Sequence, residues 1–175
     1  MTSPLSDEVM QPAMAEDDDW NRDFDPRSDA RERALNVLFE ADLRNCSTAD
    51  VTARIQVPLD DLTTVLIDGV SAHREQIDQL ISTHSHSWTI DRMATTDRNV
   101  MRIATFELLG RPEIPTAVVL NEAVGLAKRY GTDDSGKFVN GMLSAIARTV
   151  RAGAGGVAGD QISAAGGNAG TASAD

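Results

Sequence analysis

The segment 114–146 reads IPTAVVLNEAVGLAKRYGTDDSGKFVNGMLSAI and predicts two amphipathic helices joined by a short polar turn. Apolar residues recur at three- and four-residue steps on both sides of a turn rich in Gly, Asp and Ser. The first helix opens at Pro115 and Thr116, and the second begins within 133–135 and ends near Arg151. Lys137 and Phe138 follow this turn directly. A lysine can pair with an anion and an aromatic ring can stack on a base, so the two together suit binding of a polyanion whose bases can stack.

Outward from this segment, helical spacing continues toward the N-terminus, and no strand pattern appears between the chain ends. The sequence therefore predicts an all-α bundle of about five main helices. Asp29 is the expected N-cap of the first helix, with Glu32 as its capping-box partner. The expected helical segments are Ala30–Arg44, a short turn near Ala49–Ile55, a long helix from Pro58 to His84, a short segment near Asp91–Ala94, and a helix capped by Thr95 or Thr96 that runs to about Gly110.

Composition excludes several protein classes. Hydrophobic residues make up 41% of 175 residues, enough for one globular domain with a sizeable core. Cys46 is the single cysteine, so no internal disulfide framework exists, and a reducing, cytoplasmic location is expected. There is no signal peptide pattern and no apolar run of membrane-spanning length, so no membrane partner is expected. No phosphate-binding loop, nucleophile motif or metal-ligand spacing stands out, so neither an enzyme, a cofactor nor a metal site is predicted.

Charge divides the chain into three parts. Residues 1–26 hold eight acidic side chains and one arginine, and they show no helical or strand period. Residues 152–175 are mostly Gly, Ala and Ser. Both ends are expected to be disordered, because they lack the apolar surface that offsets chain entropy. Residues 27–151 carry 15 basic and 17 acidic side chains, so this domain can still present a basic face.

Three motifs, in order and spacing, resemble the family of the bacterial transcription antitermination factor NusB over about residues 30–150. They are ARERALNVLFEADLR, TDRNVMRIATFELL and NEAVGLAKRYGTDDSGKFVNGML. The resemblance implies two small helical bundles packed across each other and no catalytic activity. It also implies binding of the boxA element of ribosomal RNA transcripts together with NusE, a ribosomal small-subunit protein, in an antitermination complex on RNA polymerase. Some members self-associate, so a homodimer is an additional expectation.

The same resemblance nominates RNA-binding residues at the entrance of the last helix. Lys137 and Phe138 match the family's KF before VNG, where the cation would meet phosphate and the ring would stack on a base. The alternative for Phe138 is core packing, because it also fits the apolar stripe with Met142. Asp134 matches a further functional position, where it would shape the turn or lower RNA affinity. Its alternative role is that of a carboxylate favourable at a helix N-terminus.

Arginines of two other helices complete the expected RNA surface. Arg27, Arg31 and Arg33 lie at the start of the first helix, where the family is rich in arginine. This chain departs from that pattern, because Ser28 and Asp29 interrupt the run. Fewer cations predict weaker binding with a shallower salt dependence. Arg102, four residues after Arg98 on one helix face, would extend the surface, and the alternative for all these arginines is an ordinary solvated face.

Two residues match positions where the family meets NusE. They are Phe39, whose alternative is core packing, and Asp97, whose alternative is a favourable carboxylate at a helix N-terminus. Asn121 and Glu122 match the family's NEA and are expected to join helices through hydrogen bonds.

Two other functions remain open at this level. The first is a protein-interaction adaptor of the same complex with little RNA affinity, which the interrupted arginine run and the acidic N-terminal residues allow. The second is an accessory module of an RNA cytosine methyltransferase, since such enzymes carry a NusB-like domain. This chain is too short to hold the catalytic domain as well, so the second function requires a separate catalytic partner.

Overall fold

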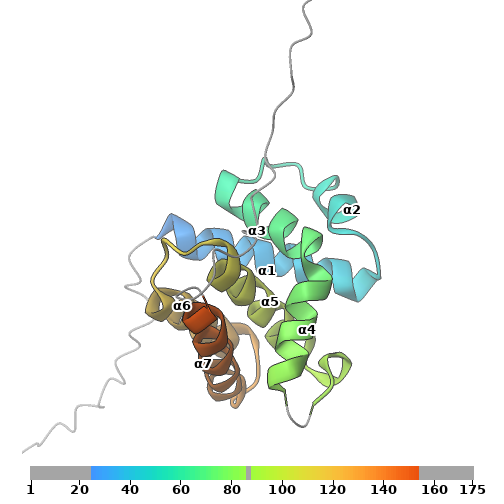
Figure 1. The fold of residues 1–175 in the computed structure, drawn as a ribbon. Coiled ribbons are helices and arrows are strands. Elements are labelled where there is room, and N and C mark those ends of the chain that lie inside the picture. Colours follow the sequence, from blue (N-terminus) through green and yellow to red (C-terminus); the bar gives the residue numbers. More distant parts are fainter. Residues whose placement is uncertain (1–24, 86–87, 154–175) are drawn as a thin grey trace, which may run out of the picture.

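The structure, a computed structural model, describes residues 25–85 and 88–153. These ranges contain seven α-helices, one short 3₁₀ turn and no strand, which confirms the all-α class (Figure 1). The elements are α1 (Pro26–Arg44), α2 (Thr48–Thr52), α3 (Asp61–Ala72), α4 (Arg74–His84), η1 (Ile90–Arg92), α5 (Thr95–Gly110), α6 (Thr116–Tyr130) and α7 (Ser135–Gly153). The acidic arm expected at 1–26 and the tail expected at 152–175 lie outside the described residues except at their inner ends.

Helix α5 is the centre of the fold. Every residue in 99–108 is buried, and α5 packs against α1, α3, α4, α6 and α7. Helix α1 also packs against α2 and α3, while α6 and α7 pack against each other. In Figure 1, α1 to α3 occupy the upper part of the molecule and α7 lies below them. Two small helical groups therefore share one core through α5, as the resemblance implied.

The start of α1 differs from the sequence prediction. The helix begins at Pro26, and Asp25 is the N-cap because its side chain accepts a hydrogen bond from the Arg27 N–H. Proline suits the first helical position, where the missing N–H has no helical partner. The predicted cap at Asp29 with a capping box to Glu32 is therefore wrong.

The predicted helix from Pro58 to His84 is in fact two helices. Asp60 caps α3 by accepting from the Thr63 N–H at 2.8 Å, so Pro58 lies before the helix and not at its first position. His73 leaves helical geometry with φ −112° and ψ 21°, and its Nδ1 is 2.9 Å from the Gly69 carbonyl oxygen at the end of α3. The apolar spacing stays helical across this break, because α3 and α4 both bury their stripes in the same core.

The remaining boundaries agree closely with the sequence. Helix α6 follows Pro115, and α7 begins at Ser135. Helix α5 does begin at Thr95, but the residue before it, Ala94, offers no side-chain cap, so the predicted threonine cap is wrong. No helix in the described ranges is long and apolar enough to cross a membrane.

Candidate functional site

The turn between α6 and α7 presents three of the predicted residues together. Asp134 and Lys137 are exposed, and neither side chain has an ion pair within the described ranges. Phe138 is half-buried and packs against the edge of the core. The core-packing interpretation of Phe138 therefore holds in part, and stacking on a base stays a prediction that depends on the exposed part of the side chain. A cation beside a half-exposed ring is an arrangement that fits single-stranded RNA.

A second lysine, missed in the sequence, lies beside this turn. A Cβ placed on Gly136 would come within 2.8 Å of the Lys128 side chain, so that side chain runs across the first turn of α7. Lys128 is exposed. Glycine at 136 thus allows a cation from α6 to lie close to Lys137. The cue in the sequence is the AKRYG run, whose lysine falls just before the turn.

Arg31 does not occupy the solvated helix face that the prediction assumed. It is only 3% exposed, and its guanidinium donates to both carboxylate oxygens of Glu107 at 2.8 and 2.9 Å. A second carboxylate, Glu122, lies 3.6 Å away. Burial alone would lower the pKa of Arg31, but the hydrogen bonds and charge of Glu107 outweigh it and raise the pKa. Arg31 therefore ties α1 to α5 and α6, and its charge is neutralised inside the protein.

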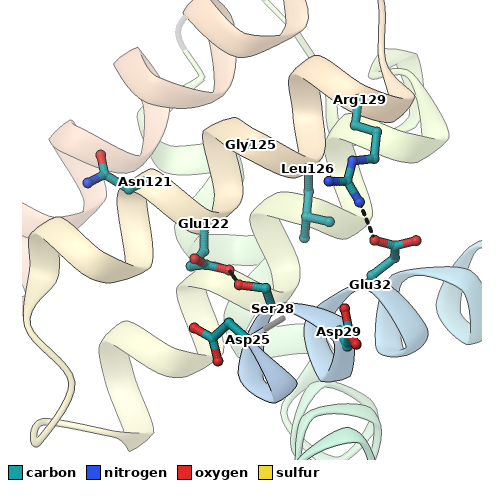
Figure 2. A pocket seen from close by; sticks show the side chains of 9 residues that line it. All are labelled: Asp25, Ser28, Asp29, Glu32, Asn121, Glu122, Gly125, Leu126 and Arg129. Carbon is teal, nitrogen blue, oxygen red and sulfur yellow. Dashed lines mark hydrogen bonds and ion pairs between the residues drawn. The ribbon is translucent and has the colours of Figure 1, made fainter. Parts of the chain in front are cut away.

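The cleft beside Arg31 is acidic. It holds about 450 Å³ between the start of α1 and α6 (Figure 2). Figure 2 shows Arg129 reaching from α6 to Glu32 on α1, and Glu122 meeting Ser28. The carboxylates that line it are Asp25, Asp29, Glu32 and Glu122. Such a lining repels phosphate, so this part of α1 is a poor RNA surface despite the nearby exposed Arg27. Glu122 does join helices as predicted.

Arg33 is exposed but paired. Its Nη1 lies 3.1 Å from the Asp60 carboxylate, and the two side chains are 55% and 39% exposed. An exposed pair of this kind is worth little and breaks easily. Arg33 remains available to an anion at small cost.

Arg102 lies in a second, partly buried ion cluster. Only 4% of its side chain is exposed, and it donates to both carboxylate oxygens of Asp78 at 2.7 and 2.8 Å. It also donates to Asp42, which accepts from Arg74 and Arg98 as well. The alternative of an ordinary solvated face for Arg98 and Arg102 is therefore wrong, and the RNA surface predicted for Arg102 is not supported, because its charge is paired and buried. The cluster joins α1, α4 and α5, and Asp42 and Asp78 are the carboxylates that the sequence interpretation missed.

The two predicted partner residues have different surroundings. Phe39 is 37% exposed on α1, and Leu43, one turn further, is 74% exposed. Phe39 is therefore available to a protein partner. Asp97 is 7% exposed and accepts a hydrogen bond from the Ser135 hydroxyl at 2.9 Å. Its carboxylate does not face solvent, so the prediction of a surface contact through Asp97 is not supported.

Comparison with known proteins identifies the family. The family model described as the NusB family matches residues 28–148. This chain belongs to the NusB family. It is 49% identical over 124 residues to the transcription antitermination protein NusB of Acidothermus cellulolyticus, covering 69% of this chain and 86% of the relative. The NusB of Myxococcus xanthus is 40% identical over 131 residues, covering 69% of this chain and 94% of the relative.

Solved NusB structures share the fold. The NusB of T. maritima is 36% identical with a TM-score of 0.63, covering 71% of this chain and 92% of that chain. A structure of the antitermination factors NusB and NusE in complex with dsRNA contains a chain that is 32% identical with a TM-score of 0.59. That match covers 70% of this chain and 96% of that one. This NusB-family chain therefore spans nearly the full length of its relatives.

Proposed function

We propose that this protein is a transcription antitermination factor that binds boxA-like RNA of ribosomal RNA transcripts together with NusE on elongating RNA polymerase. The observation that carries the proposal is the exposed Lys137 beside the half-exposed ring of Phe138, in a chain whose relatives are named antitermination proteins. The protein works in the cytoplasm by holding RNA and partner in place, and it catalyses no reaction.

The RNA surface in this proposal is narrower than the sequence suggested. Lys137 and Lys128 bind phosphates, and the exposed part of Phe138 stacks on an unpaired base. Arg27 and Arg33 add weaker contacts from α1. Arg31 and Arg102 act indirectly, because their buried pairs hold α1 and α5 in place. Phe39 belongs to the NusE surface.

The first test measures binding to labelled boxA RNA and to a scrambled RNA at several salt concentrations, with and without NusE. Lys137→Ala is expected to weaken boxA binding and to reduce the salt slope by about 0.7, the value of one phosphate contact on single-stranded nucleic acid. Phe138→Leu, which keeps apolar packing but removes the stacking ring, is expected to weaken binding by about fivefold or more.

Arg148→Ala is the matched control, because Arg148 is an exposed cation of the same helix about 16 Å further along. It should leave boxA affinity nearly unchanged. Equal binding to both RNAs, or none even with NusE, would contradict the proposal and favour the adaptor function. The relatives are named antitermination proteins, which argues against a methyltransferase module, and a methyl-transfer assay on ribosomal RNA would test this directly.

Asp134→Asn is expected to strengthen boxA binding by about threefold at low salt, with the gain vanishing at high salt. The exposed carboxylate lies three residues before Lys137 and opposes the approach of phosphate. The matched control is Asp61→Asn, an exposed acidic residue in the first turn of α3, which should leave RNA affinity unchanged. Fluorescence anisotropy at two salt concentrations measures both variants. An unchanged or weaker affinity for Asp134→Asn would show that Asp134 shapes the turn and does not repel RNA.

A further inference from the structure

The turn before α7 is built around one hydroxyl group. Ser135 is 1% exposed, and its Oγ donates to Asp97 Oδ2 at 2.9 Å. The same Oγ accepts from the Thr132 N–H at 2.8 Å and lies 3.1 Å from the Thr132 hydroxyl. A serine hydroxyl has one hydrogen and it goes to Asp97, so Thr132 is the donor in the hydroxyl pair. Ser135 thus joins α5 to the turn.

Gly131 closes the turn against this hydroxyl. A Cβ at Gly131 would collide with the Ser135 side chain and with the Ala127 carbonyl oxygen. The backbone at 131 therefore passes directly beside Ser135, and a larger residue there would push the hydroxyl away. The geometry of the turn depends on where the Ser135 hydroxyl is held.

Asp97 lies in the first turn of α5, where a carboxylate is favourable at a helix N-terminus, and it also links α5 to the turn before α7. It is 7% exposed, Ser135 is its hydrogen-bond partner, and its Oδ1 is buried without a partner within the described ranges. No cation within those ranges forms an ion pair with it. Burial raises the pKa of Asp97, which the hydrogen bond from Ser135 offsets in part. A buried carboxylate charge without an ion pair costs stability. The hydrogen bond from Ser135, and not the charge, is therefore the interaction through which Asp97 contributes to the structure.

We propose that Asp97 is a positioning residue for RNA binding, which fixes the Ser135 hydroxyl and thereby sets where Lys137 and Phe138 stand. The inference rests on the proposed function and deepens it. Helix α5 is the most buried helix, so Asp97 anchors the entrance of α7 to the rigid centre of the fold. Lys137 and Phe138 follow Ser135 by two and three residues, and a small rotation of this first turn displaces both. Binding groups need to be held within about 0.5 Å by supporting contacts.

The test compares Asp97→Ala, Asp97→Asn and Ser135→Ala in the full chain. Two quantities are measured, the boxA RNA affinity and the hydrogen-exchange rate of the Thr132 amide, which donates to Ser135. Asp97→Ala is expected to speed Thr132 exchange about tenfold and to weaken RNA binding about fivefold, following the loss of one ordering hydrogen bond. Asp97→Asn keeps an acceptor oxygen, so both quantities should stay within about twofold of wild type.

A double variant and a stability control distinguish a positioning role of Asp97 from a general loss of stability. In a Ser135→Ala background, Asp97→Ala should have no further effect on RNA affinity, because the two residues act through one hydrogen bond. Val51→Ala, a core truncation in α2, is the control: it should lower Tm but leave RNA affinity unchanged, since α2 packs against α1 and lies apart from α7 in Figure 1. If Asp97→Ala proves too unstable to study, Asp97→Asn and Ser135→Ala still decide the question.

Three results would overturn the inference. One is Thr132 exchange that does not change in Asp97→Ala or Ser135→Ala. Another is RNA affinity that falls as much in Asp97→Asn as in Asp97→Ala, since that would make the charge essential. The third is RNA affinity that falls no more in Asp97→Ala than in Val51→Ala. If the wild type fails to bind boxA RNA, the proposed function fails, whereas Thr132 exchange still decides for or against the Asp97 anchor.

Discussion

Glu107→Ala is expected to lower the free energy of unfolding by about 3–5 kcal/mol, the cost of leaving a buried charge unpaired. Glu107 is 1% exposed, and it neutralises Arg31 through two hydrogen bonds. In the variant, the Arg31 guanidinium retains Glu122 at 3.6 Å as its nearest carboxylate. Partial movement of Glu122 would bring the cost toward the lower end of this range. Urea unfolding followed by circular dichroism measures the effect.

A double variant separates the cost of an unpaired charge from the value of the pair. Arg31→Met with Glu107→Leu replaces both partners by apolar groups of similar size, and its stability should lie within about 1 kcal/mol of wild type. The same variant tests the RNA surface. Unchanged boxA affinity is expected if Arg31 acts only through the fold, and a clear loss would mean that Arg31 reaches phosphate after all. A cost below about 1 kcal/mol for Glu107→Ala alone would contradict the buried-pair interpretation.

The helices were predictable where local signals agree. The apolar spacing, Pro115 and the polar turn define the starts of α6 and α7 to within two residues, because the proline and the turn interrupt the helical pattern. The start of α1 was missed because Asp25 and Asp29 are both plausible caps, and Pro26 decides between them. The break at His73 left no trace in the apolar period, since both halves bury their stripes in one core.

The burial of Arg31 and Arg102 could not be predicted from local sequence. Arg31 finds Glu107 across 76 residues, and Arg102 finds Asp42 across 60. A helix wheel shows which face a residue occupies but not which charge lies opposite. One cue was present, because Glu107 falls within the apolar run IATFELL, and a carboxylate on an apolar face requires a buried partner. That cue points to a pair, yet only the fold shows that its partner is a predicted RNA-binding residue.

Asp42→Ala is expected to cost about 2–4 kcal/mol at pH 7, because it removes the carboxylate shared by three arginines. Arg74 and Arg102 keep Asp78, whereas Arg98 loses its ion-pair partner. Burial alone would raise the pKa of Asp42. Hydrogen bonds from Arg74, Arg98 and Asn99, with the charge of Arg102, outweigh burial and lower the pKa from 3.8 to about 2. Urea unfolding at several pH values measures this contribution.

The pH dependence has a definite sign. A carboxylate whose pKa is lower in the folded state stabilises the protein above its unfolded pKa, and this contribution disappears as pH falls through the folded value. A shift from 3.8 to about 2 corresponds to about 2 kcal/mol, so the stability difference between wild type and Asp42→Ala should shrink by about that amount between pH 4 and pH 2. The matched control is Asp68→Ala, an exposed carboxylate of α3 without an ion pair in the described ranges, which should cost much less stability than Asp42→Ala at pH 7. Parallel curves for wild type and Asp42→Ala would contradict this prediction, because they would mean that the charge of Asp42 does not stabilise the contact of α1 with α4 and α5.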